Sequence, residues 1–341
     1  MKKRIFFGAA IVVLLLLVWF GPLLLYGLRQ GYGQLRIVWL ARPVEEFLAD
    51  PAFPDSLKRK LTLIQEVRRY AIDPLGLLDT ENYKQMYDQH GEEIMWVVTA
   101  CEPFALKEKR WDFPVVGSMP YKGFFRKERA IAERDALKAE GWDTNISNPS
   151  GWSTLGWFND PILSDMLQEK EGELASTIIH EMVHATIFVK DSADFNENLA
   201  SFIGDAGAQR FLDHRFGPQS KESQDFINDD LDYRRYAGHV LAGTIALDSL
   251  YHSFTDALTT DEKRARKDTL IARVIRSMDT LTLAAHKSPS TRFRRLPNNT
   301  YFMSFRRYQA KVNTFRDECR TRFNNNFTLF IRYYREHYPY L

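Results

Sequence analysis

The sequence is short of the features that mark several classes of protein. It has two cysteines among 341 residues, and the separation of Cys101 and Cys319 does not match a disulfide framework, although the two could pair in an oxidising compartment. No low-complexity tract or internal repeat is present, which excludes a mainly disordered chain and a solenoid. The formal net charge is only +2, so electrostatics gives no reason to expect nucleic acid as the main partner.

What is present is a globular composition with one unusual end. Charged residues make up 26% and hydrophobic residues 45% of the chain, enough to surround and fill a core. The exception is an uncharged run at residues 5–26 that follows Lys2, Lys3 and Arg4 and is long enough to cross a bilayer of roughly 30 Å. Basic residues on the leading side predict a cytoplasmic N-terminus and an extracytoplasmic remainder.

The alternative for the apolar run is a cleaved signal peptide. No small-x-small cleavage site follows its core, where Pro22 and Tyr26 occur, and no cysteine is present there to accept a lipid. We therefore expect an uncleaved transmembrane anchor at residues 5–26, with residues 27–341 forming the main domain.

Four parts of the main domain differ in pattern. Residues 27–90 and 216–341 have helical spacing of apolar residues, residues 91–165 mix short β-branched runs with one amphipathic helix, and residues 166–215 predict two further helices. The second of these has Asn196 as its expected N-cap. These patterns predict an α+β fold that is mostly helical, with a small mixed sheet.

The stretch IIHEMVHATIF places polar groups inside an apolar helix. His180 and His184 are separated by four residues, so both imidazoles share one helix face and can bind one metal ion. Glu181 lies between them, where it can take a proton from a metal-bound water. The pattern HExxH therefore predicts a zinc site with Glu181 as its general base.

A catalytic zinc needs a third protein ligand and keeps a fourth position for water. A metzincin would have a histidine six residues after His184, but Lys190 is there instead. A gluzincin uses a glutamate from the next helix, and DFNENLASF offers Glu197. Asp194 is the alternative ligand. We favour Glu197 because a helix holds a ligand more rigidly than a loop does.

The chain also resembles a known family. The segments WDFPVVGSMPYKGFF, STLGWFNDP, IIHEMVHATIF, FNENLASF and NNTYF are similar to those of the bacterial predicted aminopeptidase family of membrane-associated zinc peptidases. The family's usual F-H-E-L-A-H-Q is changed here at Ile179 and Ala185, and the lipoprotein cysteine common in the family is absent. The resemblance implies a zincin-like, gluzincin-type domain at the bacterial inner membrane that faces the periplasm, with peptide or protein as substrate.

The reaction also needs residues that bind the substrate and stabilise the oxyanion. HExxH peptidases often bind substrate as an added strand, and STLGWF suggests this role for Ser153, Thr154, Leu155, Gly156 and Trp157. An oxyanion donor is also needed, for which Tyr233, Tyr236 and His239 are candidates. Asp205 and Asp160 are candidates for binding a free α-ammonium, although each is better explained as a supporting or surface charge.

Taken together, these patterns predict a membrane-anchored zinc peptidase, with aminopeptidase activity expected from the family. The spacing itself does not distinguish an aminopeptidase from an endopeptidase. The alternatives are a metal-stabilised or metal-free binding protein on the same scaffold, and an assembly factor whose helical C-terminal half docks a partner.

Overall fold

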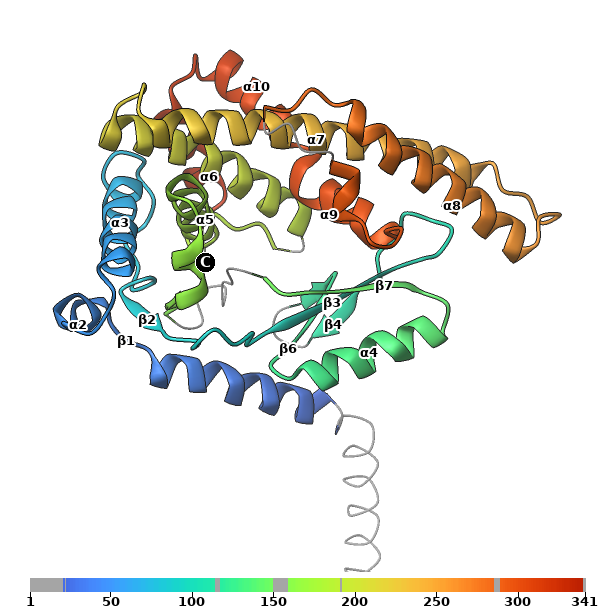
Figure 1. Cartoon of the computed structure of the whole chain (residues 1–341), viewed down its shortest axis with the longest axis horizontal. Helices are drawn as coiled ribbons and strands as arrows, with labels where there is room; N and C mark the ends of the chain where they lie inside the picture. The colour runs from blue at the N-terminus through green and yellow to red at the C-terminus, as the bar shows by residue number, and fades with distance from the viewer. Residues whose placement is uncertain are drawn as a thin grey trace, which may run out of the picture.

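The computed structural model describes residues 21, 23–113, 117–149, 159–190, 192–284 and 289–339. These residues are mostly helical, with small sheets, which confirms that part of the expected fold class. Figure 1 shows the long helix α7 running across one side of the molecule, the sheets and α4 on the opposite side, and α5 and α6 between them.

The expected transmembrane helix requires correction. Among the residues that the structure describes, no helix is both long enough and apolar enough to cross a membrane. Residues 5–20 and 22 of the expected span lie outside the described part of the chain. Residues 23–26 belong to a helix that continues to residue 40. The Tyr26 hydroxyl and the Gln30 amide of this helix donate to the Gly123 carbonyl oxygen at 3.0 and 2.9 Å, which attaches it to the rest of the protein.

The helices after residue 40 alternate with short strands in the first half and follow one another in the second half. They are α2 Val44–Ala49, α3 Asp55–Ile72, α4 Lys127–Ala139, α5 Glu171–His184, α6 Ala193–Phe216, α7 Lys221–His252, α8 Thr260–Ser277, α9 Asn299–Gln309, α10 Val312–Arg322 and α11 Phe327–His337. The strands are β1 Arg42–Pro43, β2 Gln85–Tyr87, β3 Trp96–Cys101, β4 Trp111–Phe113, β5 Gly117–Met119, β6 Lys122–Phe124, β7 Asp143–Ser147 and β8 Ile162–Leu163.

The strands form three small sheets with orders β1-β2-β8, β6-β3-β7 and β4-β5. In the second sheet β3 pairs antiparallel with both neighbours, and Val98 is opposite Ile146. The apolar run that ends at Cys101 predicts β3, and the structure confirms it. The strand β7 has the sequence DTNIS, which lacks a clear alternation of apolar and polar residues, so the sequence did not indicate it.

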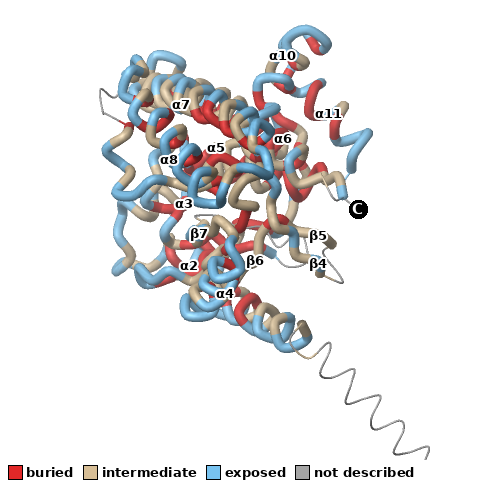
Figure 2. Tube along the Cα trace, turned by 90° about the vertical axis from the view of Figure 1, so that its right-hand side faces the viewer, coloured by how far each residue is buried: buried red, intermediate tan, exposed pale blue. Residues whose placement is uncertain are grey.

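The main core lies where α5 and α6 pack against α3 and the C-terminal helices. Its members include Ile64, Ile178, Ile179, Ile203 and Phe330, each fully removed from solvent. Figure 2 shows buried segments gathered along α5, α6 and α7, with exposed turns outside them. The centre of the molecule is therefore a rigid platform of packed helices.

Two consecutive asparagines join α9 to the second sheet. The Asn299 side chain is fully buried; it donates to the Glu102 carbonyl oxygen at 2.8 Å and accepts from the Tyr251 hydroxyl at 2.7 Å. Asn298 donates to the Thr144 carbonyl oxygen and caps α9 through Thr300. The segment NNTYF is thus a structural joint that fixes where α9 lies relative to the sheet and to α7.

Candidate metal centre

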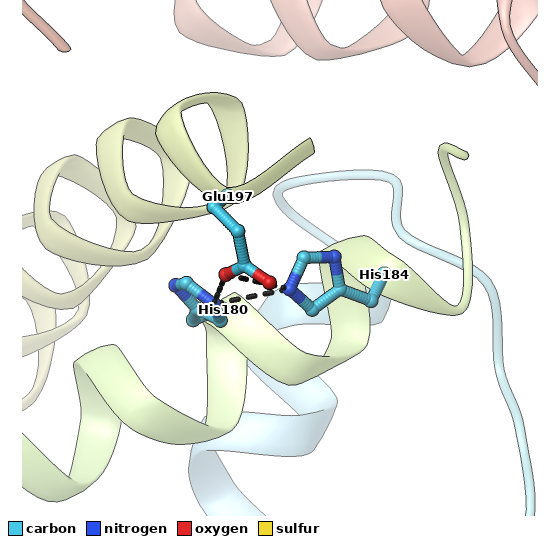
Figure 3. Close-up of side chains that lie close together, drawn as sticks. All are labelled: His180, His184 and Glu197. Atoms are coloured by element: carbon cyan, nitrogen blue, oxygen red, sulfur yellow. Dashed lines mark hydrogen bonds and ion pairs between the residues drawn. The ribbon is translucent and has the colours of Figure 1, made fainter. Parts of the chain in front are cut away.

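The HEMVH sequence occupies the last turns of α5, whose apolar residues anchor it in the core. Ile179, Met182 and Val183 have at most 1% of their surface exposed. The remaining face carries His180 and His184 and is turned toward the start of α6, where Glu197 is located (Figure 3). The apolar side of α5 thus packs in the core, and its polar side presents the two histidines of the candidate metal site.

The two helices approach closely enough for these side chains to meet. At Gly204 of α6 an added Cβ would lie 2.9 Å from the Ser176 carbonyl oxygen and 3.2 Å from the Cβ of His180. A larger residue would therefore push α6 away from α5. This crossing brings the start of α6 over the last turn of α5.

Three donor atoms converge between the helices. The Nε2 atoms of His180 and His184 are 3.1 Å apart, and Oε2 of Glu197 lies 3.3 Å from the first and 3.5 Å from the second. Among the described residues these three form the group of histidine and acidic side chains able to hold a metal ion. Asp194, the alternative ligand, is not in that group; its carboxylate acts on the pKa of Glu108 instead.

These separations fit a tetrahedral metal site. Ligand atoms about 2.0–2.1 Å from a tetrahedral zinc lie about 3.3 Å from one another, which is close to all three measured distances. Two imidazoles and one carboxylate are also the ligand types that catalytic zinc takes. The residues present therefore fit the predicted ion.

Without a metal, the Glu197 carboxylate pairs with the imidazoles of His180 and His184. Burial alone would lower the pKa of His184, but the Glu197 carboxylate outweighs it and raises that pKa to about 9. Burial favours a raised pKa for Glu197, but the two histidines hold its pKa well below the usual value of 4.5. The site thus attracts positive charge, which is what a cation-binding site requires.

The two residues that flank Glu197 hold it in place. Asn196 accepts from the Val189 amide at 2.9 Å and donates to the Val189 carbonyl oxygen at 2.8 Å. Asn198, which is fully buried, donates to the carbonyl oxygen of Arg307 and accepts from the Lys311 amide at 2.7 Å. The expected N-cap role of Asn196 is therefore wrong, because Ser192 precedes the first turn and Asn196 instead clamps the α5–α6 loop.

Two tyrosines that the sequence did not single out lie near the same site. Tyr121 lies between β5 and β6, and Tyr308 lies in the last turn of α9. Burial, and after it the Glu197 carboxylate, raises the pKa of Tyr121 to about 12 and that of Tyr308 further, and Glu181 adds to both shifts. Both phenols therefore stay protonated near the predicted base and the predicted third ligand.

Comparison with known proteins adds one finding. A family model described as "Putative aminopeptidase" matches residues 25–337. The chain belongs to this family. No curated protein and no solved structure matched the chain. Membership in the aminopeptidase family points to a peptidase, and the matched range contains every residue of the candidate metal centre.

Other residues that the sequence suggested have different positions. The expected substrate strand, Ser153 to Trp157, lies outside the described residues. The Tyr236 hydroxyl bonds that of Tyr301 at 2.6 Å, and His239 Nε2 lies 2.9 Å from the Val274 carbonyl oxygen. These two candidate oxyanion donors are thus bonded to Tyr301 and Val274, and the third, Tyr233, has Asp205, Tyr236 and Gln309 as its neighbours. Tyr121 and Tyr308 escaped notice because nothing in their spacing relates them to HEMVH.

Without metal, the ion pair between Glu197 and the two histidines makes the stability of this aminopeptidase-family protein depend on pH. The raised pKa of His184 stabilises the fold below its usual pKa of 6.5, and this is lost as pH rises through about 9. The lowered pKa of Glu197 stabilises the fold at pH values above 4.5, and this stabilisation is lost as the pH falls below that value. In chelator, Glu197→Gln is expected to lower the free energy of unfolding by on the order of 2 kcal/mol at pH 5.5 and by little at pH 10.

Urea denaturation at the two pH values measures this difference. Glu66→Gln is the matched control, because it breaks the more exposed pair between Glu66 and Arg215, which is worth less than about 1 kcal/mol. An equal loss in Glu197→Gln at both pH values would contradict the ion-pair account.

The Asn198 clamp predicts a second effect. In Asn198→Asp the new carboxylate can still accept from Lys311, but it cannot donate to the Arg307 carbonyl oxygen. We expect the free energy of unfolding to fall by about 3 kcal/mol, since a buried acceptor loses its donor and faces a negative charge. The control is Asn313→Asp, the same change at an exposed residue that accepts from Arg316. Equal denaturation midpoints for the two variants would show that Asn198 does not clamp α6.

Proposed function

We propose that this protein is a zinc-dependent aminopeptidase that hydrolyses peptide bonds, with His180, His184 and Glu197 as the zinc ligands. The observation that carries the proposal is the convergence of two imidazoles and one carboxylate at separations of 3.1, 3.3 and 3.5 Å. Membership in the aminopeptidase family supports peptide as the substrate.

Bound zinc would lower the pKa of a water molecule to about 7 and polarise the scissile carbonyl. Glu181 is the general base in this proposal. Its carboxylate contributes to the raised pKa values of His184, Tyr121 and Tyr308, so it lies near all three residues. From there Glu181 takes the proton of the attacking water and passes it to the leaving amine.

The tyrosines supply the hydrogen-bond donors that the reaction needs. Negative charge develops on the substrate carbonyl oxygen as water attacks. A phenol serves as a donor only while it keeps its proton, and burial beside Glu197 ensures this for Tyr121 and Tyr308. We therefore assign these two hydroxyls to the oxyanion, in place of Tyr236 and His239.

Metal content and turnover of four variants test the ligand set and the base. His180→Ala and Glu197→Ala are expected to lose stoichiometric zinc, while Asp194→Ala keeps it. Glu181→Gln should keep zinc but lower kcat by about 10²–10⁴-fold, since it preserves shape and removes the base. Elemental analysis measures the metal, and digestion of a peptide library measures turnover and the position of cleavage.

The same experiment separates the competing functions. Wild-type turnover at internal bonds alone would make the protein an endopeptidase. Zinc binding with no cleavage, unchanged in Glu181→Gln, would instead identify a binding or assembly protein. Zinc retained in both His180→Ala and Glu197→Ala would refute the proposed centre.

The tyrosine assignment predicts a specific kinetic pattern. Tyr308→Phe and Tyr121→Phe each remove one donor that acts mainly in the transition state. We expect kcat to fall by about 10–100-fold with KM within about twofold of wild type. Tyr236→Phe, which changes a phenol outside the site, serves as the control. Steady-state kinetics in which KM rises and kcat stays constant would assign the tyrosines to substrate binding instead.

A further inference from the structure

The helix at residues 23–40 exposes a stripe of large apolar side chains. Their spacing of three and four residues places them on one face of the helix; they are Leu25, Leu28, Tyr32, Leu35 and Trp39. Leu28, Tyr32 and Trp39 have 70–76% of their surface exposed. Figure 1 shows this helix, in blue, along the edge of the molecule opposite α7. Exposed apolar side chains that lie together in this way mark an interaction surface.

The other face of the same helix is fixed to the protein. Tyr26 and Gln30 donate to a carbonyl oxygen of β6, and Ile37 is buried in the main core. Gly33 lies so close to the Phe125 ring that a side chain would not fit between them. The helix therefore cannot turn its apolar stripe toward the core without losing these contacts.

The charges on this helix have one sign. Residues 21–44 contain three arginines and no aspartate or glutamate. Arg29 and Arg36 are exposed and follow Leu28 and Leu35 by one residue, so they border the apolar stripe on one side. No salt bridge within the described ranges involves either of these two arginines. The stripe is thus an apolar surface with a positive edge.

This combination fits an anionic lipid surface better than a second copy of the chain. If two copies packed stripe against stripe, Arg29 and Arg36 of both would border one contact, and residues 21–44 offer no acid to neutralise them. Anionic headgroups supply that negative charge, and tyrosine and tryptophan are favoured where headgroups meet acyl chains.

We propose that the exposed face of residues 23–40 lies on an anionic lipid surface, with the helix axis parallel to that surface. A helix with one apolar face, a basic edge and a polar opposite face takes this position. The contact does not depend on the proposed hydrolysis. Because the helix is bonded to β6, which begins directly after Tyr121, the contact also orients the candidate metal centre relative to the lipid.

Fluorescent labels on the full chain test this contact. The two native cysteines are buried, so a thiol-reactive bimane marks an introduced cysteine. Leu28→Cys, Tyr32→Cys and Trp39→Cys place the label on the stripe, and Ile245→Cys places it on α7 at a residue that is equally exposed. Each variant is combined with vesicles of phosphatidylcholine and phosphatidylglycerol, whose acyl chains carry bromine as a contact quencher either near the headgroup or near the chain end.

We expect bromine near the headgroup to quench the three stripe labels to within about twofold of one another, since a helix in the plane keeps each residue at one depth of about 5–10 Å. The label at residue 245 should stay unquenched. A helix that crosses the bilayer would instead separate residues 28 and 39 by about 16 Å in depth, and quenching that shifts from deep to shallow bromine between them would refute the proposal. Unquenched stripe labels would also refute it, and their cross-linking between copies would identify a second copy as the occupant.

The arginines test the choice of an anionic surface. Time-resolved fluorescence separates label in contact with lipid from label that is not, so it gives the ratio of the two populations whatever else holds the chain to the vesicle. In the Tyr32→Cys background, Arg29→Gln with Arg36→Gln should lower this ratio by about 10–30-fold, since each arginine near an anionic surface contributes about 1 kcal/mol. On vesicles of phosphatidylcholine alone the double change should have little effect.

The control for charge is Arg264→Gln with Arg266→Gln, which removes two exposed arginines from α8 and should leave the ratio unchanged. An equal loss in this control would show that net charge, and not the edge of the stripe, governs the contact. Equal ratios on charged and neutral vesicles would show that the surface needs no negative charge. Either result would overturn the proposal.

Discussion

The close crossing of α5 and α6 is the constraint on which the candidate site depends. Gly204 leaves no room for a side chain between the helices, because the His180 Cβ and the Ser176 carbonyl oxygen occupy that space. The crossing brings Glu197 within 3.3–3.5 Å of two imidazoles that belong to a different helix. Because a close-packed interior has little room to adjust, a larger side chain at Gly204 would move the three metal-ligand atoms apart.

Other parts of the fold keep the crossing in register. Asn196 fixes the loop that leaves α5, and Asn198 fixes the end of α9. The opposite end of α9 is tied to the sheet by Asn298 and Asn299. The helix α9, which carries Tyr308, is therefore held at both ends. Hydrogen bonds between these asparagines and backbone groups fix the position of the helix and so that of Tyr308.

The electrostatics of the site follow from placing several carboxylates in one partly buried space. Burial, and after it Glu197 and Glu181, raises the pKa values of Tyr121 and Tyr308, which keeps these phenols protonated. Glu197 raises the pKa of His184, so positive charge is favoured between the helices. Asp205 extends the negative region along α6. A cation at the metal position would lower the cost of burying these acids.

Much of the candidate site was accessible from sequence because its parts are local. The interval between His180 and His184 is set by helix geometry, and Glu197 follows after one short loop. The expectation of a mostly helical chain with a small sheet also came from periodicity. The expected membrane helix was wrong for the described residues, among which no helix is both long enough and apolar enough to cross a membrane.

What the tertiary structure decided depends on contacts between distant segments. The choice of Glu197 over Asp194 required the angle at which α6 crosses α5. Tyr121 and Tyr308 are separated from HEMVH by many residues on opposite sides, and only the packing of β6 and α9 brings them near Glu197. A sequence sets which groups share one helix, because backbone geometry repeats along it. It does not set which groups meet across helices, because that depends on how all the side chains pack at once.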